Sequence, residues 1–195
     1  MVSLLRTLRI SFLIFNAAFA PLCAHAAESI ETIFESDTWP AFVSKRDSSN
    51  ICFISAIPHK SGGTFSKRSV PHLTISTQDG VEFTVIATSG YQYSDAKPPE
   101  LVISSKNSDK TFVLQSVGED AIAFKDDIKS IVENLKKSKN VTLYGTSRAK
   151  TESQDVFLLD GFQESFKKMI GRCSRSSQSK KPQNTQNKKP SPKKR

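Results

Sequence analysis

Histidine and cysteine are scarce in this chain of 195 residues, which has three of each. Two of the histidines, His59 and His72, fall in the body of the chain, and no His-x-x-x-His or Cys/His cluster offers the ligand spacing of a zinc site. No Gly-x-Ser-x-Gly elbow is present to hold a serine nucleophile, and Gly62-Gly63 is not followed by a phosphate-binding motif. We therefore expect no catalytic residues, no metal site and no cofactor.

Neighbouring acidic residues do not change that expectation. Glu119-Asp120 and Asp126-Asp127 are adjacent in the sequence, whereas carboxylates that work as an acid–base pair must converge across a cleft. A hydrolase whose site forms only in three dimensions, for example around His72, is the alternative that the sequence leaves open.

Long apolar runs are also missing. The longest, residues 10–20, has about 11 residues, whereas a membrane-spanning helix needs roughly 20. Two arginines precede it and Ala24-His25-Ala26 follows it, which is the order of a secretory signal peptide with a small-x-small cleavage site. We therefore expect residues 1–26 to be a signal peptide, cleaved between Ala26 and Ala27, and the remainder to be exported without a membrane span.

Cleavage at this point would remove Cys23 and leave two cysteines, Cys52 and Cys173. Leu22, rather than a small residue, precedes Cys23, so a lipid anchor on that cysteine is the weaker alternative. In an oxidising compartment an even pair of cysteines is most simply a disulfide, and no Cys-x-x-Cys motif indicates a redox thiol. In the chain-entropy model, a bond that closes about 120 residues contributes about 4 to 5 kcal/mol. We expect one structural disulfide.

Acidic residues are absent from the end of the chain, although the whole sequence has 19 of them beside 28 Lys and Arg, for a net charge of +9. Eight of the basic residues follow Cys173, whereas every Asp and Glu lies between residues 27 and 173, where charge is nearly balanced. Residues 174–195 cannot bury enough apolar surface to fold, so we expect a disordered basic tail. Its terminal cations are Lys180, Lys181, Lys188, Lys189, Lys193, Lys194 and Arg195.

Such a tail is expected to bind polyanions through salt-sensitive and poorly specific attraction. For an exported protein the available polyanions are envelope phosphates, acidic polymers or host-surface glycans, and a solubilising tail without a fixed partner is the alternative. Binding of nucleic acid through the tail is a further alternative, which export disfavours. No aromatic residue interleaves with the lysines to stack on bases.

Alternation of apolar and polar residues is the main pattern of the body. Residues 73–77 and 81–85 alternate on either side of Gln78-Asp79-Gly80, and Asp-Gly between two such runs predicts a hairpin with a type I′ turn. Short strands separated by turns predict one antiparallel β-sandwich or barrel domain over residues 27–173. Further strands are expected at residues 41–45, 51–57, 101–105, 111–115, 141–145 and 156–160.

Two stretches have helical periodicity instead. Apolar residues recur at helical spacing in residues 126–139, and again in residues 160–171, where Gly171 is expected to end the helix. Cys173 would then follow the last helix by two residues. Residues 59–69, a glycine pair among lysines and serines, are expected to form a long mobile loop.

Five motifs stand out when the chain is followed in order. They are Asp37-Thr38-Trp39, the Cys-Phe-Ile strand at Cys52, residues 81–87 with Gly90-Tyr91, VTLYGTS at residues 141–147, and QDVFLLDGFQESFKKMIGRC at residues 154–173. In that order they resemble one protein family, the invasion-associated locus B family of exported alphaproteobacterial proteins. The resemblance covers roughly residues 38–173 and does not extend to the basic tail. Two departures from the family's pattern are Ala149-Lys150, where another glycine is usual, and Phe124, where a tryptophan is common.

The resemblance implies an immunoglobulin-like antiparallel β-sandwich with two short helices, closed by one disulfide. It also implies a periplasmic or outer-membrane-associated location and no catalytic residues. The family is named after a protein linked to bacterial entry into host cells. We therefore expect a non-enzymatic envelope protein that contributes to host-cell interaction or envelope integrity. Its expected partners are envelope polyanions or an unidentified envelope or host-surface protein.

Overall fold

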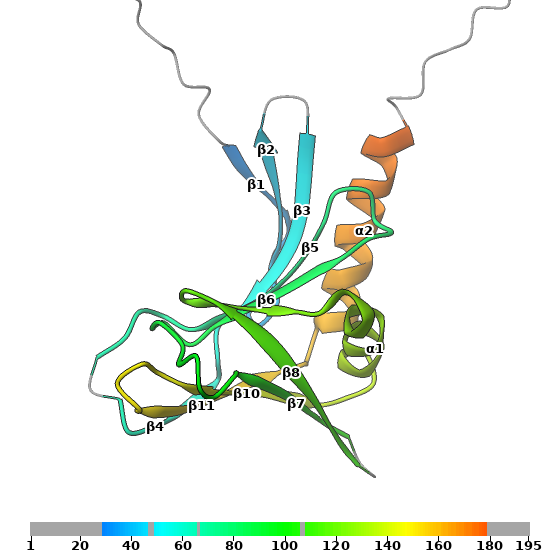
Figure 1. Ribbon diagram of the computed structural model, residues 1–195. Helices are drawn as coiled ribbons and strands as arrows, with labels where there is room; N and C mark the ends of the chain where they lie inside the picture. Colours follow the sequence, from blue (N-terminus) through cyan, green and yellow to red (C-terminus); the bar gives the residue numbers. More distant parts are fainter. Residues whose placement is uncertain (1–28, 47–48, 66, 106–107, 179–195) are drawn as a thin grey trace, which may run out of the picture.

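The structure is a computed structural model that describes residues 29–46, 49–65, 67–105 and 108–178. These residues form eleven strands and two helices (Figure 1). In chain order they are β1 (Ser29–Phe34), β2 (Ala41–Arg46), β3 (Ser49–Ala56), β4 (Lys60–Gly63), β5 (His72–Thr77), β6 (Thr84–Thr88), β7 (Glu100–Ser104), β8 (Asp109–Val117), β9 (Asp120–Ala123), α1 (Lys125–Leu135), β10 (Asn140–Thr146), β11 (Glu152–Leu158) and α2 (Phe162–Gln178).

All eleven strands of the described residues belong to one antiparallel sheet, in the order β1-β2-β3-β5-β6-β9-β8-β7-β10-β11-β4. β8 joins the two halves of this sheet, because residues 109–113 pair with β7 and residues 114–117 pair with β9. Figure 1 shows β8 crossing from one half to the other. The mainly β, antiparallel fold with two helices is therefore confirmed, and its two halves share one continuous set of hydrogen bonds.

Side chains from both halves of the sheet meet the helices in one apolar core. On β5, Leu73 and Ile75 are fully buried and alternate with partly exposed residues, as the period of two requires. Trp39, just before β2, is also fully buried: its Nε1 donates a hydrogen bond to Leu158 O at 2.7 Å, and its ring meets Phe162 edge-on at 4.9 Å between centroids. α2 packs against β1, β2 and β3, and α1 packs against β6 and β7.

β5 and β6 form the predicted hairpin, but the prediction of a two-residue turn between them is wrong. The connection spans residues 78–83. Asp79 Oδ1 accepts hydrogen bonds from the backbone N–H groups of Val81, at 2.8 Å, and Glu82, at 3.0 Å, while Gly80 adopts a φ of 80°. An aspartate side chain that accepts nearby N–H groups competes with the strand ladder for them. Residues 81–83 therefore leave the sheet and form a wide loop.

Both helices end elsewhere than predicted. α1 stops at Leu135, and residues 136–139 connect it to β10, which begins at Asn140. α2 continues through Gly171 to Gln178, so Cys173 lies inside the helix and not after it. A glycine in a helix costs about 1 kcal/mol, and burial of the following Cys173 outweighs that cost. Helical structure therefore extends into the first residues of the expected tail.

Three of the strands have no signal in the sequence: β1, β4 and β9. β1 and β4 are the two edges of the sheet, and most of their residues are exposed, so no alternation marks them. β4 falls within the segment expected to be a mobile loop, and it pairs with β11 through Gly62 and Gly63. The six strands predicted outside the hairpin each overlap an observed strand.

Candidate functional site

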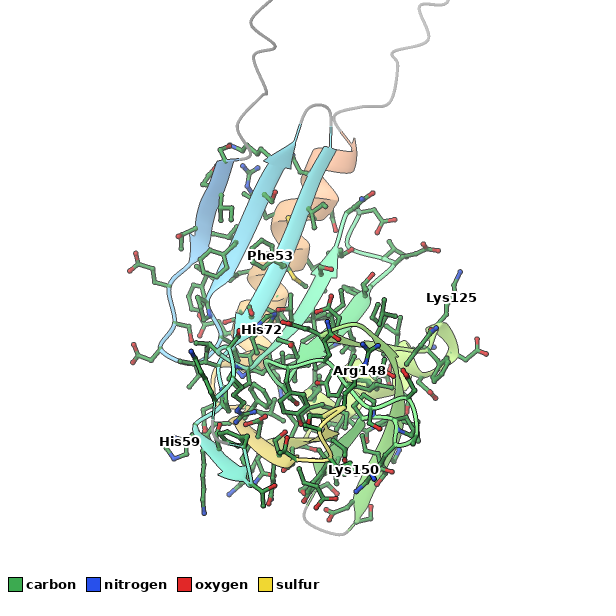
Figure 2. The ribbon with its side chains drawn as sticks, turned by 60° about the vertical axis from the view of Figure 1, so that its left-hand side comes forward. Phe53, His59, His72, Lys125, Arg148 and Lys150 are labelled. Atoms are coloured by element: carbon green, nitrogen blue, oxygen red, sulfur yellow. A yellow bond between two sulfur atoms is a disulfide. The ribbon has the colours of Figure 1, made fainter. Side chains whose placement is uncertain are left out.

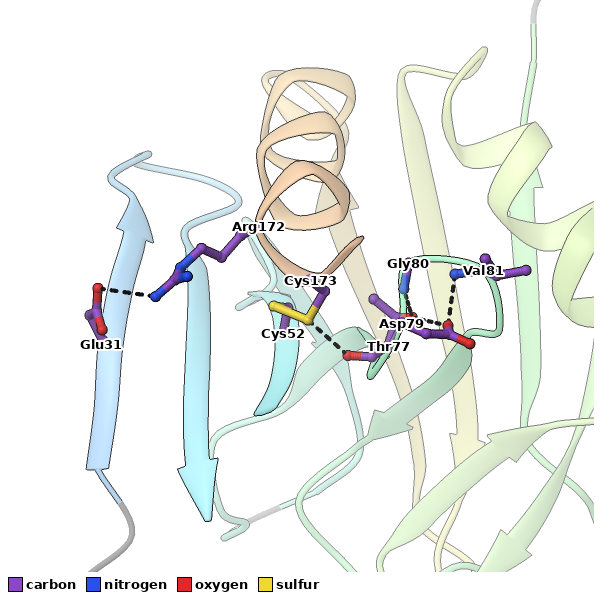
Figure 3. The surroundings of a disulfide bond; sticks show 8 residues. All are labelled: Glu31, Cys52, Thr77, Asp79, Gly80, Val81, Arg172 and Cys173. Carbon is purple, nitrogen blue, oxygen red and sulfur yellow. Dashed lines mark hydrogen bonds and ion pairs between the residues drawn. A yellow bond between two sulfur atoms is a disulfide. The ribbon is translucent and has the colours of Figure 1, made fainter. Parts of the chain in front are cut away.

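The predicted disulfide is confirmed: Cys52 on β3 is bonded to Cys173 on α2, with 6.0 Å between the Cα atoms (Figure 3). Both cysteines are fully buried, and the bond closes a sequence separation of 121 residues. It fastens the last helix to the middle of the β1–β5 half of the sheet.

The disulfide also lies beneath the β5–β6 loop. Cys173 Sγ is 3.5 Å from Thr77 O, which is a packing contact because a disulfide sulfur has no proton to donate. Gly80 sits so close to α2 that a Cβ there would overlap Ser174 Oγ. On the opposite side of the helix, Arg172 lies 3.9 Å from Glu31 of β1. Figure 3 shows α2 held between the edge strand and the loop.

The β5–β6 loop forms one wall of a groove whose other wall is α1. The groove has a volume of about 630 Å³. Its floor is apolar, with Phe83 from the loop and Ile128 and Val132 from α1, and Val81 at its lip is 75% exposed. The full lining is Val81, Glu82, Phe83, Thr84, Ala123, Lys125, Ile128, Lys129, Val132, Glu133 and Lys136.

A second hollow of about 320 Å³ adjoins the groove where α1 ends beside α2. Lys136 lines both, and its Nζ lies 4.4 Å from the centre of the Phe166 ring. Phe166 in turn contacts Phe83, with ring centroids 5.2 Å apart. Gln163 Nε2 donates a hydrogen bond to Lys136 O, which ties the two helices together at this point. We call the two hollows together the α1–α2 groove.

Lysines from both helices surround the α1–α2 groove. Four of them line it, namely Lys125, Lys129, Lys136 and Lys167, whereas its acidic residues are Glu82 and Glu133. None of the four lysines forms an ion pair with a carboxylate among the described residues. The helical spacing of the lysines beside Ile128 and Val132 is the one sequence signal for this site. The aromatic floor has no such signal, because it depends on the loop that brings Phe83 to α2.

A buried ion pair lies outside the α1–α2 groove, between the β4–β5 segment and β11. Arg68 binds Asp155 with two parallel hydrogen bonds of 2.6 Å, and their side chains are 5% and 0% exposed. Ser61 Oγ donates to Asp155 at 2.7 Å, and Arg68 Nη1 donates to Ser89 O at 3.0 Å. The Arg68 guanidinium also lies 3.8 Å from the centre of the Phe65 ring. This pair fastens the segment between β4 and β5 onto β11.

A cluster of hydroxyl groups lies beside that pair. Tyr91 OH and Ser153 Oγ are 2.6 Å apart, and Tyr93 OH donates to Ser89 Oγ at 3.0 Å. Burial raises the pKa of both Tyr91 and Tyr93 above the usual value, so both side chains stay protonated. Because Arg68, Asp155 and these hydroxyls have hydrogen-bond partners and are mostly buried, with Tyr91 half-buried at the edge, we interpret the cluster as a structural fastening.

Gly145 on β10 is the position where this cluster leaves no space. A Cβ on Gly145 would lie 2.6 Å from Tyr91 OH, 2.8 Å from Ser89 Oγ and 2.9 Å from Tyr93 Cε1. We expect Gly145→Ala to lower the free energy of unfolding by about 1 to 3 kcal/mol through overpacking, measured by urea denaturation. Gly62→Ala is the matched control, because a Cβ on Gly62 would meet no atom within 4 Å. Equal stability of the two variants would contradict the prediction.

The other residues singled out in the sequence do not gather into a site. Figure 2 shows His72 and Phe53 on the face of β5 and β3 turned away from α2, with His59 well apart from them. Neither histidine lines the α1–α2 groove. No group of three or more His, Cys, Asp or Glu side chains suited to a metal ion occurs in the described part of the chain.

The signal-peptide and tail predictions fall outside the described residues. They concern Ala26 and Ala27 at the cleavage site, and the tail cations Lys180, Lys181, Lys188, Lys189, Lys193, Lys194 and Arg195. Within the described ranges, neither helix is long and apolar enough to span a bilayer.

Fold and site together define a disulfide-closed antiparallel β protein with two helices flanking a groove. No known family model matches the sequence, and no curated protein matches it. Among solved structures, the crystal structure of invasion associated protein B from Bartonella henselae is similar, with a TM-score of 0.50 and 16% sequence identity, over 73% of this chain and 97% of that one. This likeness confirms the fold that the sequence motifs implied, and the neighbour bears the name of the family that they resemble.

Proposed function

We propose that this chain is a non-enzymatic, exported protein of the cell envelope, of the invasion-associated locus B type, and that it acts by binding. The observation that carries the proposal is the buried Cys52–Cys173 disulfide in a fold similar to that of the Bartonella protein. Disulfides persist in oxidising compartments, which agrees with the signal-peptide pattern of residues 1–26. Its role is in host-cell interaction or envelope integrity.

Two features supply the binding surfaces. The α1–α2 groove combines an apolar floor with four lysines that form no ion pair among the described residues, a composition suited to holding a ligand that is apolar on one side and anionic on the other. The basic end of the chain adds attraction to envelope polyanions.

Export is tested by fractionating producing cells and measuring the intact mass of the protein without reductant. We expect the protein in the periplasmic or outer-membrane fraction, with Ala27 as its first residue and a mass lower by two hydrogen atoms than that of the dithiol. Recovery from the cytosol with residues 1–26 still attached would overturn the proposal. The same measurement establishes whether the tail is intact.

The role of the tail is tested by removing residues 179–195, a deletion that keeps the whole of α2. We expect association with purified envelopes to fall at least about fivefold at low salt, and association of the full chain to fall similarly as salt is raised, because exposed charges are screened. A full-length variant with every tail Lys and Arg replaced by Gln controls for length and should behave like the deletion. Salt-insensitive association that survives the deletion would exclude this role.

A further inference from the structure

We propose that the α1–α2 groove binds an acidic, amphipathic segment of a partner protein, with apolar side chains on the groove floor and carboxylates on the lysines. The inference rests on the proposed binding function, but it depends neither on export nor on the basic tail. Three observations support it. The groove has a concave apolar floor, its cations are distributed along its length, and the chain's own terminal segments carry the wrong charge to fill it.

The floor is shaped for a chain segment and not for a flat surface. Phe83 and Phe166 contact each other at its base, and Ile128, Val132 and Ile170 extend it along both helices. A planar bilayer cannot reach side chains that lie between a helix and a loop, whereas an amphipathic helix lays one apolar face into such a groove. Val81 offers an exposed apolar contact at the lip.

The cations are spread along the groove and do not gather at one end. Lys125, Lys129 and Lys136 follow one side of α1, so their Cα atoms are spaced over about 16 Å of helix at 1.5 Å per residue. Lys167 adds a cation from α2. A lipid or fatty acid has a single anionic head, which would pair with one cluster of lysines. A row of cations fits a ligand that carries several carboxylates along its length.

The groove's two acidic residues limit where those carboxylates can lie. Glu82 is on the loop wall and Glu133 is on the α1 wall. They would repel a ligand carboxylate next to them and accept a ligand lysine or arginine. We therefore expect the bound segment to be acidic overall but to tolerate a basic residue near its middle.

The protein's own terminal segments do not fit as occupants. Residues 179–195 contain lysines and arginine but no acidic residue, and residues 1–26 likewise contain arginines but no acidic residue. Both would be repelled by a rim of four lysines. We therefore propose an occupant from another molecule and not either of these two segments.

The test is a selection of random segments of about 16 residues, displayed on phage, against the oxidised mature protein. We expect the enriched segments to be acidic, with apolar residues at i, i+3 or i+4, and i+7. The strongest segment is then synthesised with a fluorescent label, and its dissociation constant is measured by anisotropy.

The decisive variant is Lys125→Glu/Lys129→Glu. Both lysines are exposed and lie in the first half of α1, where negative charge favours the helix, so the variant should fold. We expect it to weaken binding at least about tenfold. The matched control is Lys60→Glu/Lys110→Glu, which makes the same change in net charge on β4 and β8, away from the groove, and should bind like the wild type. Removal of residues 179–195 should also leave binding within about twofold, because the lysines of the tail attract the same acidic segment only through screened charge.

Three results would overturn the inference. The first is enrichment of no segment, or only of segments without acidic residues. The second is equal loss of binding in the groove variant and in the control variant. The third is binding of the wild type, but not of Lys125→Glu/Lys129→Glu, to vesicles of phosphatidylcholine with phosphatidylglycerol, which would make the groove a lipid site. None of these results bears on the location of the protein, so they can be told apart from failure of the export proposal.

Discussion

Replacing both cysteines, in the variant Cys52→Ala/Cys173→Ala, is expected to lower the free energy of unfolding by about 4 to 5 kcal/mol. The two cysteines are 121 residues apart, so loss of the bond removes a constraint on most of the unfolded chain. In the chain-entropy model, a loop of this length accounts for a stabilisation of about 4 to 5 kcal/mol. Alanine is the better replacement, because serine would place a hydroxyl at two fully buried positions and add its own desolvation cost. A domain of this size is typically stable by about 5 to 15 kcal/mol, so the variant should be near its limit.

The loss should also have a local signature. Without the bond, the contacts that hold the end of α2 include its packing against Thr77 and Gly80 and the 3.9 Å ion pair of Arg172 with Glu31, none of them covalent. We expect amide hydrogen exchange to rise first in residues 170–174 and in the β5–β6 loop, which forms a wall of the groove. Binding at the groove should weaken with it.

Urea unfolding measures the global effect, followed by the fluorescence of Trp39, which is the single tryptophan and is fully buried. The wild type under reducing conditions is the control, and it should unfold at the same urea concentration as the double alanine variant. If the variant unfolds at the midpoint of the oxidised wild type, the bond contributes nothing to stability and the prediction is wrong.

The sequence predicted those elements whose signal is local. Alternation in residues 73–77 predicts β5, because the inward Leu73 and Ile75 are apolar and the outward Thr74 and Ser76 are polar; the last inward residue, Thr77, is polar but buried. The disulfide could be predicted without any geometry, since the two cysteines that follow the predicted signal peptide have one possible pairing. The end of α2 could not, because Gly171 ends a helix by local preference, whereas the buried Cys173 beyond it extends the helix through tertiary contact.

The sites depend on contacts between distant segments, and this is why they were missed. Asp79 directs the β5–β6 loop out of the sheet and so places Phe83 against Phe166, which no pattern in residues 81–85 indicates. In β11, Ser153 and Asp155 share the inward face with Phe157. Along the chain this inward face is polar first and apolar only from Phe157. Apolar alternation therefore predicts the strand only from residue 156. The structure shows that the polar half is buried against Arg68.

That buried polar half leads to the second large effect, for which we expect Asp155→Asn to lower the free energy of unfolding by about 3 to 5 kcal/mol. The substitution keeps the shape of the side chain but removes its charge, so the Arg68 guanidinium is left buried, 5% exposed, without its counter-ion. The segment between β4 and β5, which Arg68 holds against β11, should also open locally in this variant. Trypsin is therefore expected to cleave after Lys67 faster than in the wild type, and urea unfolding gives the global loss.

Two controls separate the ion pair from a general sensitivity to substitution. Lys97→Ala removes a pair with Glu152 whose side chains are 62% and 65% exposed, and it should leave the unfolding midpoint unchanged. Arg68→Met/Asp155→Leu removes both buried charges at once and should recover much of the stability, because apolar side chains of similar size need no counter-ion. If Asp155→Asn is as stable as the wild type, the pair is not fastening the β4–β5 segment. If the double variant is no better than Asp155→Asn, its loss of the hydrogen bonds with Ser61 and Ser89, which Asp155→Asn leaves in place, costs as much as removing the unpaired charge gains.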